Sequence, residues 1–237
     1  MSSNLKHFYT SFLMLQNCYK NPTLYRSFFF VIIIFYLTFV YFFMIAKQKR
    51  SKDRVDKIIS TAKLILEHGE VADITIARIS EMSNLKRTST YKFFPTPDHI
   101  KSYLQNELIK ESSLFINSNT QKPESNELRN ILNELVTSLI NYFNESSPAK
   151  KLILDSSVFG AQINSLSILS ESINKFVSSN IELPSMFNEK GVFLVLTQII
   201  ISVLSLNYKM DRELNDIGKN EAVRASLSYL IACTAKQ

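Results

Sequence analysis

The segment of residues 75–94 constrains the fold of this chain more than any other. Its pattern predicts two short helices joined by a tight turn. Thr75 is suited to cap the first helix, because its hydroxyl can accept a hydrogen bond from an unpaired backbone N–H group. The apolar residues that follow recur at helical spacing and predict one face turned toward a core: Ile76, Ile79 and Met82.

Asn84 interrupts this apolar period. Asparagine is the non-glycine residue that most readily adopts a left-handed backbone conformation, and a sharp turn after a helix needs that conformation. The second helix is predicted to begin near Leu85. The segment is therefore predicted to be a helix-turn-helix.

The predicted second helix begins with cations and short hydroxyl side chains, namely Lys86, Arg87, Thr88 and Ser89. Such side chains reach base edges and phosphates when the end of a helix enters the major groove of DNA. The motif is therefore a candidate for binding double-stranded DNA.

The chain resembles the DNA-binding domain of TetR-type transcriptional regulators over about residues 51–108. The shared marks lie in order along the chain: Ile58, Ile59, Ala62, Leu64, Gly69, Thr75, Ile79, Leu85, Tyr91 and Phe94. The departures are Ser80, Asn84, Lys86 and Pro97, where the family usually has Ala, Gly, Ser and Lys. A turn can absorb the first two changes, whereas the last two leave the phosphate contacts open.

The resemblance implies an all-α fold with a three-helix helix-turn-helix head and a helical-bundle body. It also implies an effector-responsive repressor that binds a palindromic operator as a homodimer through its last two helices. In the family pattern Tyr91 offers its hydroxyl to a phosphate, whereas Phe94 belongs to the core. The expected DNA-binding residues are Thr75, Lys86, Arg87, Thr88, Ser89, Tyr91 and Lys92.

The net charge of +6 is concentrated around this motif. Residues 47–95 contain eleven lysine and arginine residues against six aspartate and glutamate residues, an excess of five positive charges. Binding to DNA phosphates requires such a basic cluster. A solvated basic face is the alternative explanation for the same composition.

Cysteine, histidine and glycine usage argues against a catalytic or metal site. Cys18 and Cys233 lie at opposite ends of the chain, and His7, His68 and His99 have no partner at metal-ligand spacing. The four glycines form no phosphate-binding loop or nucleophile elbow. We expect no metal, no cofactor and no enzymatic activity.

Residues 27–46 contain no charged side chain, and about twenty such residues in a helix span the ~30 Å core of a bilayer. They predict a transmembrane helix within an N-terminal extension of residues 1–46. More lysine and arginine residues follow this stretch than precede it, so the positive-inside rule places the remainder in the cytoplasm. The head would then be anchored to the cytoplasmic membrane.

A start called too early at the gene level explains the same stretch. Met44 opens a short basic segment of the kind that precedes the first helix in TetR-type regulators, and residues 1–43 are rich in residue types that AT-rich DNA encodes. The protein would then begin at Met44 and be soluble in the cytoplasm. The sequence leaves both explanations open.

Two more helices complete the predicted head, residues 47–110. The first, at about 52–68, carries an apolar stripe and ends at Gly69, which is expected in the left-handed conformation. The fourth helix is predicted to run to about Lys110. Its start signal is Thr96 as N-cap, Pro97 at the first position and Asp98 near the positive helix end.

A polar linker at residues 117–124 is the predicted boundary of a helical body, residues 118–237. Apolar residues recur at helical spacing from Leu128 to Phe143, and a helix restarts at Ser147 and stops near Gly160. Strand-like alternation is absent from the sequence, which indicates a bundle.

Residues 191–208 carry no charge and are apolar on most sides. Either a second membrane span or a helix buried between protein surfaces explains them, and polar residues such as Gln198 and Asn207 favour burial. The final helix is expected to begin near Asp211.

By the resemblance, the body binds a small-molecule effector that shifts the fourth helix and changes the separation of the two heads. The residues of the effector site are unknown. The aromatic candidates, which plain core packing explains equally, are Phe115, Tyr142, Phe143, Phe159, Phe176 and Phe193.

A membrane-anchored helical interaction protein is the rival class. Its basic cluster would bind anionic lipid headgroups, which lysine and arginine beside a membrane span also favour. Lipid binding needs charge alone, so it would survive replacement of Thr88 and Ser89 by alanine, whereas operator binding would not.

Overall fold

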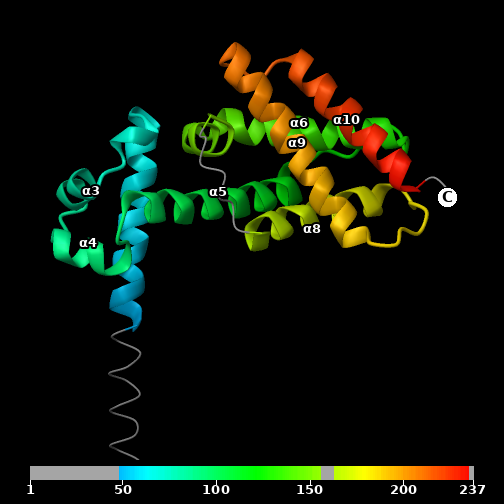
Figure 1. Ribbon diagram of the computed structural model, residues 1–237. Helices are drawn as coiled ribbons and strands as arrows, with labels where there is room; N and C mark the ends of the chain where they lie inside the picture. Colours follow the sequence, from blue (N-terminus) through cyan, green and yellow to red (C-terminus); the bar gives the residue numbers. More distant parts are fainter. Residues whose placement is uncertain (1–47, 156–162, 235–237) are drawn as a thin grey trace, which may run out of the picture. The chain divides into compact units, whose positions relative to one another are not determined.

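The computed structural model describes residues 48–155 and 163–234, and every regular element in these ranges is helical (Figure 1). The prediction of an all-α fold is confirmed. The chain divides into two compact units, one ending at Val55 and one beginning at Asp56. Residues 48–55 of the first unit are helical, and the elements described below belong to the second. The predicted transmembrane helix at 27–46 and the alternative start at Met44 lie outside the described residues.

The head of the second unit consists of helical residues 56–68, the 3-10 turn η1 (Val71–Asp73), α3 (Ile76–Met82) and α4 (Arg87–Phe93). Its buried apolar side chains come from these elements and the turns beside them: Ile58, Ala62, Ile65, Leu66, Ile74, Ile76, Ile79 and Phe94. The predicted cap is confirmed, because the Thr75 hydroxyl accepts a hydrogen bond from the Arg78 backbone N–H.

Two local predictions in the head are wrong. Met82 is 47% exposed, because each helical residue advances about 100°, so a side chain six positions after Ile76 lies about 120° away from it around the axis. Gly69 does not have a positive φ. A Cβ atom on Gly69 would lie 2.5 Å from Asp73 Oδ2 and 3.1 Å from the Ile65 carbonyl oxygen, so a side chain there would have to displace the Asp73 carboxylate.

The predicted start of α5 (Pro97–Asn119) is confirmed, with the Thr96 hydroxyl accepting from the His99 N–H and Pro97 in the first turn. The predicted end near Lys110 is wrong. The helix continues for nine further residues because its polar residues there are packing positions: the Ser113 hydroxyl lies 2.6 Å from that of Ser172 in a buried contact between α5 and α8.

The body contains α6 (Leu128–Glu145), α7 (Ser147–Ala149), the π-helix η2 (Lys150–Asp155), α8 (Ile163–Asn180), α9 (Glu189–Asp211) and α10 (Asp216–Thr234). A restart at Ser147 is confirmed, but the segment changes to a π-helix at Lys150, and Gly160 lies outside the described residues. The predicted boundary between head and body at the polar linker 117–124 remains a prediction, although its first three residues belong to α5.

The last two helices pack against each other along their lengths (Figure 1). The final helix begins at Asp216 rather than near Asp211, because α9 continues to Asp211 and Arg212 turns the chain with a φ of 60°. The Asn215 side chain then accepts from the Gly218 N–H and caps α10.

α9 is long and apolar enough to cross a membrane by length and composition, although 33% of its most apolar window is buried inside the protein. It packs against α8, α10 and η2. The polar side chain of Thr197 is fully buried and donates to the Phe193 carbonyl. These contacts bury one side of α9 inside the protein, whereas Val195, Leu206 and Met210 of the same helix stay exposed in the single chain.

Candidate nucleic-acid interface

The turn between α3 and α4 is a Schellman motif built on Asn84, whose φ is 53°. The Leu85 N–H donates to the Ser80 carbonyl at 3.1 Å and the Asn84 N–H donates to the Glu81 carbonyl at 3.2 Å. These two bonds satisfy carbonyls that the helix end leaves unpaired. The expectation of a left-handed Asn84 is therefore confirmed, and asparagine fills the position where the family pattern has glycine.

This turn gives a first prediction. Asn84→Ala is expected to lower the free energy of unfolding by about 1–2 kcal/mol, because alanine pays the left-handed penalty without a compensating local hydrogen bond. Asn84→Gly is the matched comparison and should match or exceed the wild type, since glycine adopts this conformation freely. Urea denaturation of both variants measures the difference; equal stabilities would contradict the role assigned to this position.

A buried hydrogen bond fixes α4 against α3. The hydroxyls of Ser80 and Thr90 lie 3.2 Å apart, with Thr90 fully buried and Ser80 nearly so. The serine that departs from the family pattern therefore has a partner on the second helix. Because a buried hydroxyl is costly to leave unpaired, this contact favours one relative orientation of the two helices.

The predicted DNA-binding side chains lie mainly on the solvent side of this scaffold. Ser89 is half-buried, and the exposed members are Thr75, Lys86, Arg87, Thr88, Tyr91 and Lys92. α4 contains no carboxylate. Within the described part of the chain, none of the three cations at α4 forms a salt bridge. The arrangement presents cations, hydroxyls and one phenol to solvent together, on a helix that the core holds in place.

Tyr91 and Phe94 divide as expected, with Tyr91 53% exposed and Phe94 5% exposed. Phe94 packs edge-on against Tyr103 of α5, with ring centroids 5.6 Å apart. Tyr91 is therefore not a core residue. Its hydroxyl is available for a hydrogen bond from outside the protein.

Two members of the basic cluster have structural partners that the sequence pattern did not indicate. Arg78 pairs with Asp73 at 2.9 Å, and Lys63 pairs with Glu111 of α5 at 2.7 Å. Charge counting alone cannot separate such residues from free cations. One local signal was available for Arg78: the carboxylate of Asp73 lies just before the helix that carries Arg78 and is a candidate partner for it.

Two cavities lie between helices of the body. One, of about 370 Å³, lies between α6 and the α9–α10 turn and is lined by polar groups including Glu213, Asp216 and Lys219. The other, of about 180 Å³, lies between α8 and α9 beside Phe193 and Lys190. Among the residues that the structure describes, no group of three or more His, Cys, Asp and Glu side chains could hold a metal ion.

Three of the six aromatic candidates are buried in the core, namely Tyr142, Phe143 and Phe193, whereas Phe115 and Phe176 are half-buried. Tyr142 contacts the rings of Phe115 and Phe143, and its hydroxyl donates to the Leu108 carbonyl at 2.6 Å. Burial raises the pKa of the Tyr142 phenol, so it stays protonated as a donor. Phe193 alone among the described candidates borders one of the two cavities above. Phe159 lies outside the described residues.

Comparison of the sequence with protein-family models finds no match, and comparison with curated proteins finds none either. The fold does have counterparts among solved structures. A TetR-family transcriptional regulator from Streptomyces coelicolor is similar with a TM-score of 0.56 at 15% identity, covering 76% of this chain and 99% of its own. A TetR transcriptional regulator from Rhodococcus sp. RHA1 has a TM-score of 0.55 at 13% identity, covering 78% and 98%.

The TetR family repressor AlkX from Dietzia sp. strain DQ12-45-1b, implicated in biodegradation of n-alkanes, has a TM-score of 0.50 at 12% identity, covering 77% of this chain and 99% of its own. These structures are matched over almost their full length, head and body together. The chain therefore has the fold of the TetR-family transcriptional regulators.

Proposed function

We propose that this protein is a DNA-binding transcriptional regulator in the cytoplasm, and that α4 is its recognition helix. The observation that carries the proposal is the exposed, carboxylate-free surface of α4, with Lys86, Arg87 and Lys92 beside the hydroxyls of Thr88 and Ser89. Cations supply affinity for phosphates, whereas hydroxyls and arginine can also read base edges. The fold shared with TetR-family regulators supports the same function.

The proposed active form is a homodimer through α9 and α10. Large apolar side chains on these helices are left exposed in the single chain: Val195, Leu206, Met210, Ile217 and Ile231. A second copy would cover such a surface, and two-fold symmetry would place the two recognition helices on a palindromic site. We propose a repressor as the form of regulation, with a small-molecule effector bound in the body.

The direct test is selection of bound sequences from a pool of random double-stranded DNA by the full chain. We expect enrichment of a palindrome whose half-sites lie about one helical turn, roughly 10 base pairs, apart or a multiple of it. Sedimentation of the protein on the selected duplex should give two chains per site. Failure to enrich any sequence at low salt would overturn the proposal.

A variant at the hydroxyls of α4 separates DNA reading from charge-driven binding to lipid. Thr88→Ala/Ser89→Ala leaves every cation in place, so binding to phosphatidylserine vesicles, if any, should be unchanged. Affinity for the selected duplex is expected to fall about ten-fold or more, because these groups could no longer hydrogen-bond to the DNA.

The matched control for this variant is Ser118→Ala/Ser178→Ala, which removes two exposed hydroxyls from α5 and α8. It should bind DNA like the wild type in a gel-shift titration. Unchanged DNA affinity in Thr88→Ala/Ser89→Ala, together with retained vesicle binding, would favour the lipid-binding alternative.

A further inference from the structure

The helix that ends at residue 68 leaves backbone carbonyls that need donors. In a continuing helix the Leu66 carbonyl would accept from the Glu70 N–H. That N–H instead donates to Asp73 Oδ2 at 2.7 Å. Helix ends carry partial negative charge on such unpaired carbonyls, so this turn of the head is a place where a cation is stabilising.

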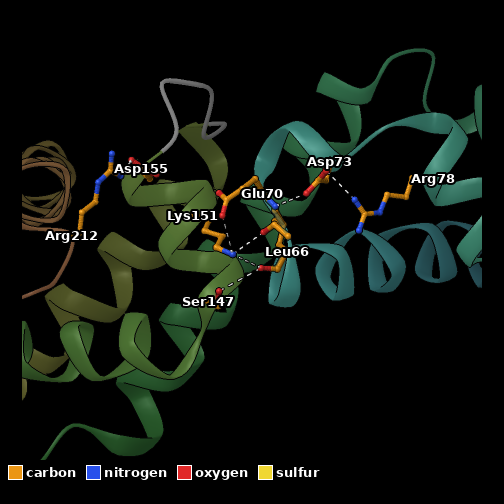
Figure 2. Close-up of polar contacts among 9 residues, drawn as sticks. Leu66, Glu70, Asp73, Arg78, Ser147, Lys151, Asp155 and Arg212 are labelled. Carbon is orange, nitrogen blue, oxygen red and sulfur yellow. Dashed lines mark hydrogen bonds and ion pairs between the residues drawn. The ribbon is translucent and has the colours of Figure 1, made fainter.

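Lys151 of the body supplies that cation (Figure 2). Its Nζ donates to the Gly69 carbonyl at 2.7 Å and to the Leu66 carbonyl at 3.1 Å, and it lies 3.7 Å from Glu70 Oε1. The Ser147 hydroxyl adds a weaker bond to the Leu66 carbonyl at 3.4 Å. An ammonium group has three N–H donors, and three acceptors of the head surround this one. The Lys151 side chain is only 20% exposed.

The segment that carries Lys151 is itself tied to two other helices. It belongs to the π-helix η2, a rare geometry that is frequent at functional sites. The Leu152 carbonyl accepts from Gln105 of α5 at 3.3 Å, and the Leu154 carbonyl accepts from Ser205 of α9 at 2.6 Å. A shift of α5 or α9 would therefore act on η2, and through it on Lys151.

The turn at residues 66–70, whose carbonyls accept hydrogen bonds from Lys151, is also bonded to the helix-turn-helix. The Asp73 carboxylate, which binds the Glu70 N–H, also pairs with Arg78 of α3 at 2.9 Å (Figure 2). α3 in turn is fixed to α4 by the buried contact of Ser80 with Thr90. These hydrogen bonds and ion pairs connect η2 to the recognition helix α4 by a route that does not include α5.

We propose that Lys151 is a positioning residue that locks the head onto the body by capping the end of helix 56–68. Together with the Ser147 hydroxyl, it attaches the head to the body in addition to the covalent connection through α5. Where it concerns DNA, this inference rests on the proposed function: the lock would fix the orientation of α4, and displacement of η2 would release it.

The test compares Lys151→Met with Lys150→Met in the full chain by hydrogen–deuterium exchange. Methionine keeps an unbranched apolar stem and removes the charge. Lys150 is a matched control, because its Nζ lies over the Tyr208 ring of α9 within the body. We expect amides of residues 66–78 to exchange about ten-fold faster in Lys151→Met, since charge-assisted bonds are removed, and to be unchanged in Lys150→Met.

Lys151→Arg keeps the charge and should restore most of the protection, and Ser147→Ala should give a smaller increase confined to the same segment. Faster exchange spread equally over α6 would assign Lys151 to global stability and overturn the proposal. Unchanged exchange in residues 66–78 would overturn it as well.

A second readout uses the selected duplex. Lys151→Met is expected to change DNA affinity about five-fold or more, with the dependence of affinity on salt unaltered, because the Lys151 ammonium is bound to carbonyls of the head. A reduced salt slope would make it a direct DNA contact and overturn the positioning role. The exchange experiment needs no DNA, so absence of DNA binding by the wild type would remove the proposed function and leave the locking contact standing.

Discussion

Replacing Lys86 and Arg87 together by alanine is expected to lower the affinity for the selected duplex on the order of 100-fold per head. Both side chains are exposed where α4 begins, Lys86 at its N-cap and Arg87 at its first residue. The slope of log affinity against log salt should become shallower by about 0.9 for each DNA phosphate that the variant no longer neutralises. Gel-shift titrations at several salt concentrations measure both quantities.

The matched control for this prediction is Lys122→Ala/Lys175→Ala, which removes the same charge from exposed positions of the body. If general electrostatic attraction accounts for binding, both double variants will weaken it equally. If α4 enters the groove, only the first will. A full salt slope retained by Lys86→Ala/Arg87→Ala would exclude these residues from the interface.

Gly218→Ala is expected to lower the free energy of unfolding by about 3 kcal/mol, because a tightly packed site would be overfilled and hydrogen bonds displaced. A Cβ atom on Gly218 would lie 2.2 Å from Asn207 Cγ and Oδ1 and 2.6 Å from its Cβ. Asn207 cannot easily move, since it binds both Asp211 and Asn215 at the corner between α9 and α10. Urea denaturation measures the loss.

A substitution cycle identifies the cause of that loss. The atoms nearest to the added Cβ all belong to the Asn207 side chain. Gly218→Ala should therefore be close to neutral in an Asn207→Gly background, where those atoms are gone. Ser228→Ala, at an exposed position of α10, serves as the control for mutating this helix. A loss of the same size in both backgrounds would contradict the close-approach explanation.

The sequence predicted the parts of this protein whose geometry depends on near neighbours. Thr75 and Thr96 cap their helices and Asn84 takes the left-handed turn, because each acts on backbone groups within a few residues of itself. Lys86, Arg87 and Lys92 are exposed, as side chains that are expected to contact DNA must be. The all-α fold rested on the same helical periodicity.

Predictions from residue spacing were wrong where packing against elements distant in the sequence determines the local structure. α5 runs past Lys110 because its Ser113 hydroxyl packs against α8, at positions 55 and 59 residues away in the chain. Gly69 lies close to the Asp73 carboxylate and does not take the left-handed conformation that its position suggested. A polar residue or a glycine has several uses, and the surrounding structure selects among them.

The sequence by itself determined the helices, their caps and the helix-turn-helix, because these depend on interactions over three to five residues. Only the tertiary structure decided which lysine and arginine side chains are exposed to solvent and which are bound to other groups of the protein. Arg78 counts toward the basic cluster but is paired with Asp73, and Lys151, which belongs to no sequence motif, donates to carbonyls 82 and 85 residues earlier. The physical reason is that a charge is satisfied by its neighbours in space, which local spacing does not specify.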